Sequence, residues 1–332
     1  MCGTSHPTKP AGRSADGRAV ARFRLAAALA VAWLWLAGCA DPNGPYAPGR
    51  EPAAEVTVRW VGAYVPSGVW RELRGLRALE AQLGRQLDLA HWYASWDDAF
   101  DPEPLHAVLA GGRVPLISWQ PMHQDLHDIT AGHHDDYLRT WAQGIKNAPG
   151  TVYLRPFPEM NGDWVPWNGD PQALRDAWTH LTTLFENEGT HNVRWVWSPN
   201  VTDEPRTEHN RMENYYPGHD QVHVLALSGY NWGDTRPNIG WRSFETIIEE
   251  PYARLTRLGP QPVWMAETAS SEAGGDKAAW IRGMFAASAE FPRLEAIVWF
   301  NEDKETDWRI ESSERALRAF ASVLRTLDEP LP

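Results

Sequence analysis

Two glutamates in this chain of 332 residues stand at the ends of apolar runs. Glu159 comes shortly after the run Y-L-R-P-F at 153–157, and Glu267 directly follows P-V-W-M-A at 262–266. A carboxylate in a buried setting is costly unless it is paired or used. Two carboxyl groups that flank one bond can serve as proton donor and as nucleophile or base, which is the chemistry of glycosidic-bond hydrolysis. We therefore predict that Glu159 and Glu267 form a catalytic pair.

Eight short apolar runs can position these side chains. They lie at residues 56–64, 87–93, 114–119, 152–157, 193–198, 222–230, 262–267 and 296–300. Helical patterns separate several of them, at residues 102–111, 135–146, 171–189, 244–258, 277–288 and 313–327. Strands that alternate with helices predict an α/β protein, here a single-domain (β/α)8 TIM barrel. The ends of strands four and seven can then face each other across one mouth.

A doubly wound open sheet is the alternative fold for the same alternation. That fold commonly carries a glycine-rich phosphate turn after its first strand. The corresponding segment here is G-A-Y-V-P at 62–66, which has no G-x-G-x-x-G pattern. The barrel is therefore the favoured prediction.

Aromatic and amide side chains dominate the predicted strand ends. The chain contains 19 Trp against 9 Tyr and 9 Phe. Indole rings stack on the apolar faces of sugars, and amides bind hydroxyls, so this mouth suits a glycan; core packing is the alternative use of a Trp. We expect core positions for Trp141, Trp178 and Trp280, which lie on helices. The predicted substrate-binding residues are Arg155, Trp164, Trp119, Asn200, Tyr230, Trp232 and Trp299.

The segment R-P-F-P-E-M-N-G-D-W at 155–164 is similar to the R-P-F-H-E-M-N-G-x-W signature of glycoside hydrolase family 26, whose best-known members are β-mannanases. Further landmarks of that family recur at 196–200, 229–232, 262–267, 297–301 and 307–309. The likeness covers about residues 56–325. It implies a retaining endo-β-glycosidase that resembles mannan endo-1,4-β-mannosidases.

The resemblance implies a role for individual residues. Glu159 would be the general acid/base and Glu267 the nucleophile, with Arg155 orienting Glu267 and Tyr230 hydrogen-bonded to it. Arg155 and the tyrosine hydroxyl should lower the pKa of Glu267, whereas an apolar setting should raise the pKa of Glu159.

Two tryptophans receive a role from the same resemblance. Trp164 and Trp299 would stack on sugars near the point of cleavage. No metal and no cofactor are implied.

Two positions depart from the mannanase pattern. Pro158 stands where the signature has His, and Ser228 stands where family members often have Asp. We expect both positions to line the sugar-binding region. Another β-glycan or a bacterial exopolysaccharide is therefore an alternative substrate, and a non-catalytic glycan-binding lipoprotein is the alternative from another class.

A group of histidines offers a second possible site. His123, His127, His133 and His134 lie near Asp135 and Asp136, and the first two have the i, i+4 spacing of helical zinc sites. The stretch has no H-E-x-x-H pattern and resembles a loop of the family. We therefore predict no metal there.

The N-terminal segment predicts export. A basic lead precedes the apolar run 25–37, which suits a signal peptide, and L-A-G-C at 36–39 resembles a bacterial lipobox. We predict a lipoprotein signal peptide at 1–38, lipidation of Cys39, a flexible tether at 39–54 and the barrel domain at 55–330. An ordinary signal peptide is the alternative. Anchoring to the cell envelope, at the outer membrane or cell surface, would follow.

The net charge of the chain indicates which classes of partner to expect. Its formal net charge is −12, and removal of residues 1–38 would leave 26 Lys and Arg against 42 Asp and Glu, a net −16. An acidic surface repels phosphate backbones, so nucleic acid is not expected as a partner. We expect a monomer that acts on a neutral β-glycan polysaccharide and meets the membrane through its lipid.

Overall fold

The computed structural model describes residues 58–328, and within them eight parallel strands close into a barrel in chain order. The strands are β1 (Trp60–Tyr64), β2 (Leu89–Ser95), β3 (Val114–Gln120), β4 (Val152–Pro156), β5 (Val193–Trp197), β6 (Val224–Asn231), β7 (Val263–Ser270) and β8 (Leu294–Phe300). β1 pairs with both β2 and β8, which closes the sheet. The prediction of a (β/α)8 barrel is confirmed, and the open doubly wound sheet is excluded.

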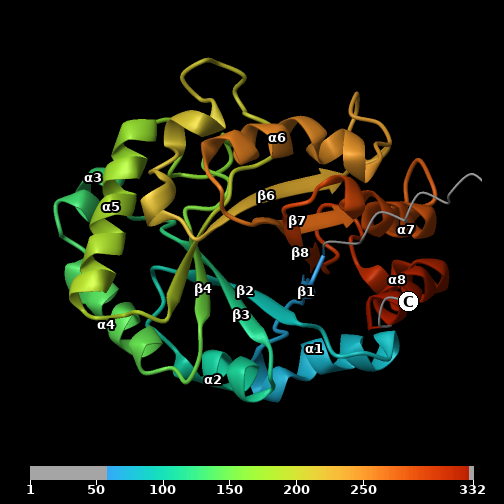
Figure 1. Ribbon diagram of the computed structural model, residues 1–332, viewed down its shortest axis with the longest axis horizontal. Helices are drawn as coiled ribbons and strands as arrows, with labels where there is room; N and C mark the ends of the chain where they lie inside the picture. Colours follow the sequence, from blue (N-terminus) through green and yellow to red (C-terminus); the bar gives the residue numbers. More distant parts are fainter. Residues whose placement is uncertain (1–57, 329–332) are drawn as a thin grey trace, which may run out of the picture. The chain divides into compact units, whose positions relative to one another are not determined.

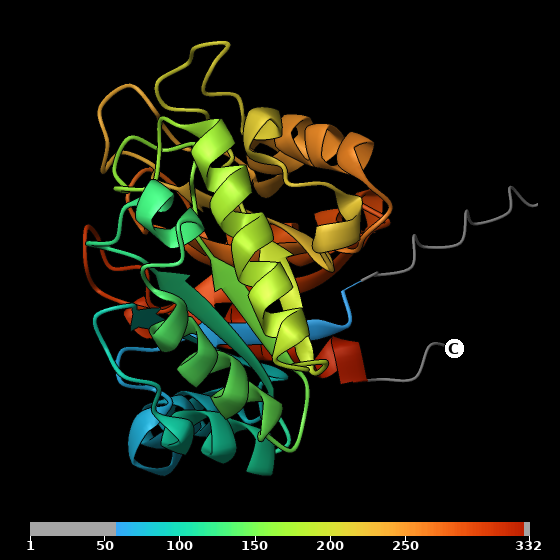
Figure 2. The ribbon, with the colours of Figure 1, turned by 90° about the vertical axis from the view of Figure 1, so that its left-hand side faces the viewer.

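Helices surround the strands, as Figure 1 shows. They are α1 (Trp70–Leu83), α2 (Pro102–Ala110), α3 (Leu126–Thr130), α4 (Asp135–Lys146), α5 (Pro171–Asn187), α6 (Phe244–Leu258), α7 (Lys277–Ala287) and α8 (Glu314–Asp328). Short 3-10 turns lie at Met212–Tyr215, His219–Gln221, Ser288–Glu290 and Ile310–Ser312. In Figure 2, α5 runs along the side of the barrel with α4 next to it.

Side-chain caps fix the starts of several helices. The carboxylates of Asp101, Asp170 and Asp276 accept hydrogen bonds from backbone amides in the first turns of α2, α5 and α7. Prolines occupy the first turn of α2 and α5, where no amide hydrogen is needed. α1 begins without a side-chain cap and was not predicted, although its buried residues Leu73, Leu76, Leu79 and Leu83 recur at helical spacing.

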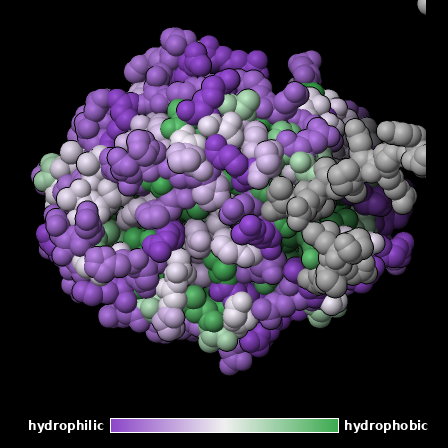
Figure 3. All heavy atoms as spheres, viewed as in Figure 1, coloured by the Kyte–Doolittle hydropathy of each residue, from purple (hydrophilic) through white to green (hydrophobic). Residues whose placement is uncertain are grey.

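The apolar residues form two separate clusters because side chains on a strand point alternately to its two faces. The smaller cluster fills the barrel and includes Leu89, Leu116, Val196, Val224, Ala226, Trp264, Ala266, Ala296 and Val298. The larger cluster lies between the strands and the helices. A strand residue next to an inward-facing position therefore packs against helices. Outside these clusters, the surface is mainly hydrophilic in the view of Figure 3.

The pairing of β6 with β7 is irregular where the site forms. The register shifts between Leu227 and Ser228, so that Ser228 pairs with Glu267 across the two strands. A further shift between Met265 and Thr268 interrupts the pairing of β7 with β8. Irregular pairing of this kind re-aims side chains next to functional sites.

The predicted signal peptide at 1–38, the lipidated Cys39 and the tether at 39–54 lie outside the described residues, as do the two ends of the domain predicted at 55–330. Across residues 58–328, the helices are all too short or too polar to cross a lipid bilayer.

Candidate active site

Glu159 lies just beyond β4 on a backbone that its sequence does not favour. Phe157 and Glu159 have φ values of 51° and 58°, in the left-handed region that residues with a side chain rarely adopt. The amide of Glu159 donates to the carbonyl oxygen of Ser198 at 2.8 Å, which ties the turn to the end of β5. Strained residues persist where surrounding contacts fix them, and they often mark functional sites.

Two neutral donors hold the carboxylate of Glu159. Trp164 Nε1 donates to Oε2 at 2.7 Å, and Asn200 Nδ2 donates to Oε1 at 3.0 Å. Asn161 fixes Asn200 in turn, because its Oδ1 accepts from the Asn200 amide at 2.7 Å and its Nδ2 donates to the Asn200 carbonyl at 2.9 Å. The two side chains that donate to the Glu159 carboxylate are therefore neutral, and no cation among residues 58–328 forms an ion pair with it.

The pKa of Glu159 lies above its usual value. Burial is the largest cause, and the negative charge of Glu267 adds to it, while Arg155 and the two donors oppose it. A carboxyl group of this kind favours the protonated form, as a proton donor must.

Trp164 is the exposed aromatic residue of the site, with half of its surface accessible. Its indole lies directly against Gly162, where an added Cβ would meet the ring at 2.3 Å. A glycine at 162 is therefore needed for the indole to reach the carboxylate of Glu159.

Glu267 lies within β7 and has a different environment. Arg155 on β4 donates to its Oε1, and the Tyr230 hydroxyl on β6 donates to its Oε2 at 2.7 Å. Burial alone would raise the pKa of Glu267, but the charge and hydrogen bonds of Arg155, with help from Tyr230, hold it below the usual value. Glu267 is therefore ionised at neutral pH, as a nucleophile must be.

Arg155 is completely buried, and its other bonds go to neutral groups. Its guanidinium donates to Ser118 Oγ at 3.0 Å and to Ser228 Oγ at 2.5 Å. Its sole carboxylate partner in an ion pair, among residues 58–328, is Glu267. A serine at 228 thus leaves the positive charge of Arg155 directed to Glu267.

The expectation that Pro158 and Ser228 line the sugar-binding region is wrong. Both side chains are buried. The carbonyl oxygen of Pro158 accepts a hydrogen bond from Trp167 Nε1 at 2.9 Å. Ser228 pairs with Glu267 across β6 and β7 and accepts a hydrogen bond from Arg155. The two departures from the mannanase pattern therefore change the support of the catalytic groups.

His91 was not predicted as a site residue, and it lies next to Ser118, a partner of Arg155. Its Nε2 is 2.8 Å from Ser118 Oγ, which also binds Arg155. Burial lowers the pKa of His91 to about 3, so the imidazole is neutral. Burial raises the pKa of Tyr93, two residues on, and the negative charge of nearby Glu267 raises it further. The two-residue alternation of β2 was the available signal for both side chains.

The structure contradicts the prediction that Trp119 binds substrate. Trp119 is fully buried and packs against Trp141 on α4, with ring centroids 4.7 Å apart, and against Phe185 on α5. Its Nε1 donates to the Tyr137 hydroxyl at 3.1 Å. Neighbouring Ser118 takes the inward position, so the pleat turns Trp119 toward the helices.

The prediction that Trp299 binds substrate is wrong for the same reason. It is fully buried, packs against Trp280 on α7 and Phe320 on α8, and donates from Nε1 to the Trp308 carbonyl at 2.9 Å. Phe300 takes the inward position and stacks on Tyr64, with centroids 5.0 Å apart. Of the two residues named for sugar stacking, only Trp164 is exposed, and it contacts the carboxylate of Glu159.

Trp232 lies at the strand ends beside the pair of glutamates. It is half-buried and contacts the rings of Tyr230 and Trp308 at 6.0 Å and 4.8 Å between centroids. Arg236 covers the Trp232 ring at 3.4 Å. Trp308 was not predicted as part of this layer, although it supports both neighbours.

The histidines do not converge on one point. His123 pairs with Asp97 at 2.6 Å, His133 with Asp128 at 3.0 Å, and His127 approaches Asp170 at 3.7 Å. In the part of the chain that the structure describes, no group of three or more His, Cys, Asp or Glu side chains is placed to hold a metal ion.

Comparisons with known proteins point to one family. Residues 131–291 match the model of Glycosyl hydrolase family 26. Endoglucanase H of Acetivibrio thermocellus is 33% identical over 275 residues, which cover 80% of this chain and 30% of that protein. A mannan endo-1,4-beta-mannosidase A and B of Caldalkalibacillus mannanilyticus is 31% identical over 148 residues, 40% of this chain and 27% of that protein. The chain spans about a third or less of the length of the curated relatives it matches.

Solved structures share the fold. A GH26 beta-mannanase from Bacteroides ovatus superposes with a TM-score of 0.62 at 16% identity, over 83% of this chain and 90% of that one. A mannanase from Bacillus subtilis gives a TM-score of 0.58 at 17% identity, over 80% and 85%. The (β/α)8 barrel is thus the fold that this chain shares with these structures, and within it residues 131–291 match a glycosyl hydrolase family 26 domain.

Proposed function

We propose that the chain is a retaining endo-β-glycosidase in which Glu267 is the nucleophile and Glu159 the acid/base. The observation that carries the proposal is the opposed environment of the two carboxyl groups. Glu267 is bonded to a buried guanidinium and has a lowered pKa, whereas Glu159 has two neutral donors and a raised pKa. Environments that separate two carboxyl pKa values in this way assign the acid and the base or nucleophile.

The reaction has two displacements. In the first, Glu267 attacks the anomeric carbon while Glu159 gives its proton to the glycosidic oxygen. The bond between that carbon and that oxygen breaks, the leaving group departs as an alcohol, and a glycosyl ester forms on Glu267. In the second, Glu159 takes a proton from water, the water oxygen replaces Glu267 at the anomeric carbon, and the ester bond breaks. The product keeps the β configuration.

We propose a β-glucan as the first substrate to test and mannan as the second. The relative named endoglucanase aligns with 80% of this chain, against 40% for the mannosidase of Caldalkalibacillus mannanilyticus. Pro158 and Ser228 also differ from the mannanase signature; Pro158 directly precedes Glu159, and Ser228 accepts a hydrogen bond from Arg155.

Release of reducing ends from a panel of glycans tests the proposal. Mixed-linkage β-glucan, cellulose, glucomannan, mannan, xylan and a bacterial exopolysaccharide should be compared with wild-type protein, Glu159→Gln and Glu267→Gln. We expect release from β-glucan or mannan that both variants abolish. Binding without release from any glycan would instead favour a glycan-binding protein that performs no hydrolysis.

We also propose, from the sequence of residues 1–54, that the protein is exported and anchored to the cell envelope by lipid on Cys39. Mass spectrometry of the mature N-terminus tests this. A mature chain that begins at a diacylated Cys39 supports the anchor, and one that begins elsewhere with an unmodified residue contradicts it.

A further inference from the structure

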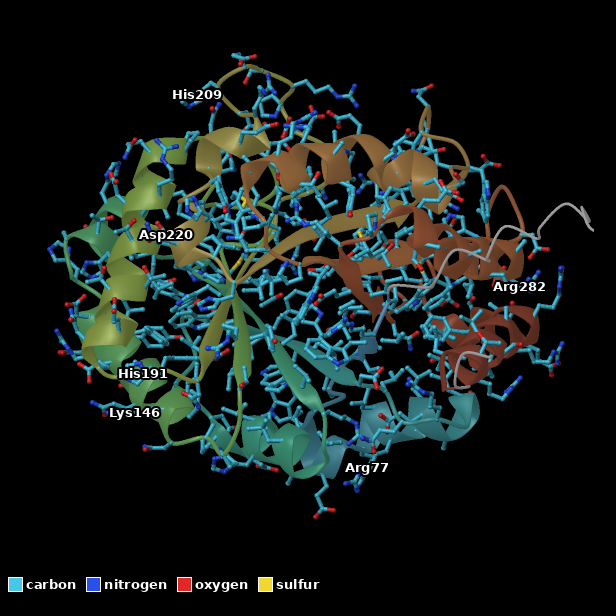
Figure 4. The ribbon with its side chains drawn as sticks, in the orientation of Figure 1. Arg77, Lys146, His191, His209, Asp220 and Arg282 are labelled. Atoms are coloured by element: carbon cyan, nitrogen blue, oxygen red, sulfur yellow. The ribbon has the colours of Figure 1, made fainter. Side chains whose placement is uncertain are left out.

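A polar cavity of about 590 Å³ lies beside the candidate active site. One wall is the long loop after β5, represented by residues 201–211, and the other consists of residues 242–254 at the start of α6 and along it. In Figure 4 this loop, marked by His209, projects above α6. Glu159 and Glu267 do not line the cavity, so it is a separate feature of the same end of the barrel.

The carboxylates that line the cavity already have cationic partners. Asp203 and Glu250 approach Arg254 at 2.7 Å and 3.7 Å, and Glu208 approaches Arg211 at 3.5 Å. These pairs neutralise the acidic part of the wall, whose lining contains two further arginines.

Arg206 and Arg242 are those other cations. Across residues 58–328, neither guanidinium forms an ion pair with a carboxylate or a side-chain hydrogen bond, and Nε of Arg242 is buried with its donor unused. Burial and the nearby positive charge of Arg206 both lower the pKa of Arg242. Arg206 is exposed and Arg242 is half-buried. Two neighbouring guanidinium groups with free donors can bind an anion, which would also relieve their mutual repulsion.

Both walls are tied to the candidate active site. The amide of Arg242 donates to Oδ1 of Asn231 at 3.0 Å, and Asn231 directly follows Tyr230, the partner of Glu267. On the other side, Asn161 Nδ2 donates to Asp203 Oδ1 at 2.9 Å, and the Asn161 carbonyl accepts from the Glu204 amide at 2.8 Å. One wall of the cavity is therefore bonded to Asn161, which supports Asn200 beside Glu159, and the other is bonded to the residue that follows Tyr230.

We propose that Arg206 and Arg242 bind an anionic substituent of the glycan, such as the carboxylate of a uronic acid, while the chain to be cut lies at the glutamates. A guanidinium group can give a carboxylate two parallel hydrogen bonds, and a sulfate ester presents similar oxygens. This proposal rests on the proposed glycosidase function. It refines the expectation of a neutral β-glycan by adding an acidic side group to a neutral main chain.

Binding of three versions of one β-glucan tests the site: unmodified, carboxymethylated and sulfated. Affinity electrophoresis at fixed ionic strength should compare wild-type protein with Arg206→Gln, Arg242→Gln and the double variant. Arg211→Gln is the matched control, because Arg211 lines the same cavity but is paired with Glu208 and Glu213. We expect each of the first two changes to weaken binding of the carboxymethylated glucan by about tenfold. The control should have little effect, and binding of the unmodified glucan should not change.

Equal retention of the carboxymethylated glucan by wild-type protein and the double variant would overturn the proposal, as would an equal loss of binding to the unmodified glucan. A loss confined to the sulfated glucan would retain an anion site and overturn its assignment to carboxylate. Because this readout needs no turnover, its failure is distinct from failure of the glycosidase proposal, which would appear as no release of reducing ends from any glycan.

Discussion

The ends of β4 and β7 each present one glutamate, but they hold it by different means. On β7, Glu267 lies within the strand and is fixed by a buried guanidinium and a tyrosine hydroxyl. Beyond β4, Glu159 lies on a left-handed turn and is held by an indole and an amide. One site stabilises charge, and the other tolerates it poorly.

This difference shows how one residue type can receive two tasks. The chain supplies Arg155 from β4 to Glu267, although Arg155 and Glu159 are only four residues apart in sequence. Because of the turn after β4, Glu159 is hydrogen-bonded to Asn200 and Trp164, whereas the guanidinium group of Arg155 is bonded to Glu267. Substitutions at Glu267, Glu159 and Tyr230 each change one side of this comparison.

The largest effect is expected from Glu267→Gln. An amide cannot form the glycosyl ester, so kcat should fall by about 10⁴-fold or more at every pH. Initial rates on the best glycan of the panel measure the loss. Retention of a tenth of the wild-type kcat would show that another group is the nucleophile.

Glu159→Gln should cost about 10²-fold to 10⁴-fold on glycans, whose leaving group needs a proton. The loss should be much smaller for the first step with an aryl glycoside that carries a good leaving group, because that oxygen leaves without protonation. Stopped-flow release of the aryl alcohol measures this step. Similar losses on both kinds of substrate would contradict the role of proton donor.

The same two substitutions should differ in stability. Glu267→Gln leaves the buried charge of Arg155 without its carboxylate and should lower the free energy of unfolding by about 3–5 kcal/mol. Glu159→Gln removes a carboxylate that burial and Glu267 disfavour, so stability at neutral pH should change by less than about 1 kcal/mol. Urea unfolding followed by circular dichroism compares them, and equal losses would contradict the difference in environment.

A smaller effect is expected from Tyr230→Phe, which removes one hydrogen bond to the ionised Glu267. The pKa of Glu267 should then rise, so activity should be lost at a higher pH as the solution is acidified. We expect the acidic limb of the kcat/KM profile to move up by about 1 pH unit. The basic limb, which reports Glu159, should stay in place, and movement of the basic limb alone would reverse the assignment.

Sequence reasoning located the fold and the carboxylates because both leave strong local signals. Eight apolar runs separated by helical patterns predict the barrel, and Glu159 and Glu267 end two of those runs. Trp119 and Trp299 were misplaced because nearness to a strand end does not say which face a side chain takes. A shift of one residue along a strand exchanges the barrel interior for the helix layer.

Other features depend on contacts that no local pattern contains. The left-handed turn at Glu159 requires the carbonyl of Ser198 from the next strand, and the position of Ser228 opposite Glu267 requires the register shift in β6 and β7. Arg206 and Arg242 are 36 positions apart and meet only because the loop after β5 approaches α6. Such sites become visible once the chain is folded.

Rescue by azide tests the central claim most directly. Glu159→Ala and Glu267→Ala should each be supplied with an activated aryl β-glycoside and sodium azide, and the product anomer read by proton NMR. With Glu159→Ala, azide attacks the glycosyl ester on Glu267 and should give the β-glycosyl azide. With Glu267→Ala, azide takes the place of the nucleophile in one displacement and should give the α-glycosyl azide. The same anomer from both variants, or the opposite pattern, would contradict the division of roles between the two glutamates.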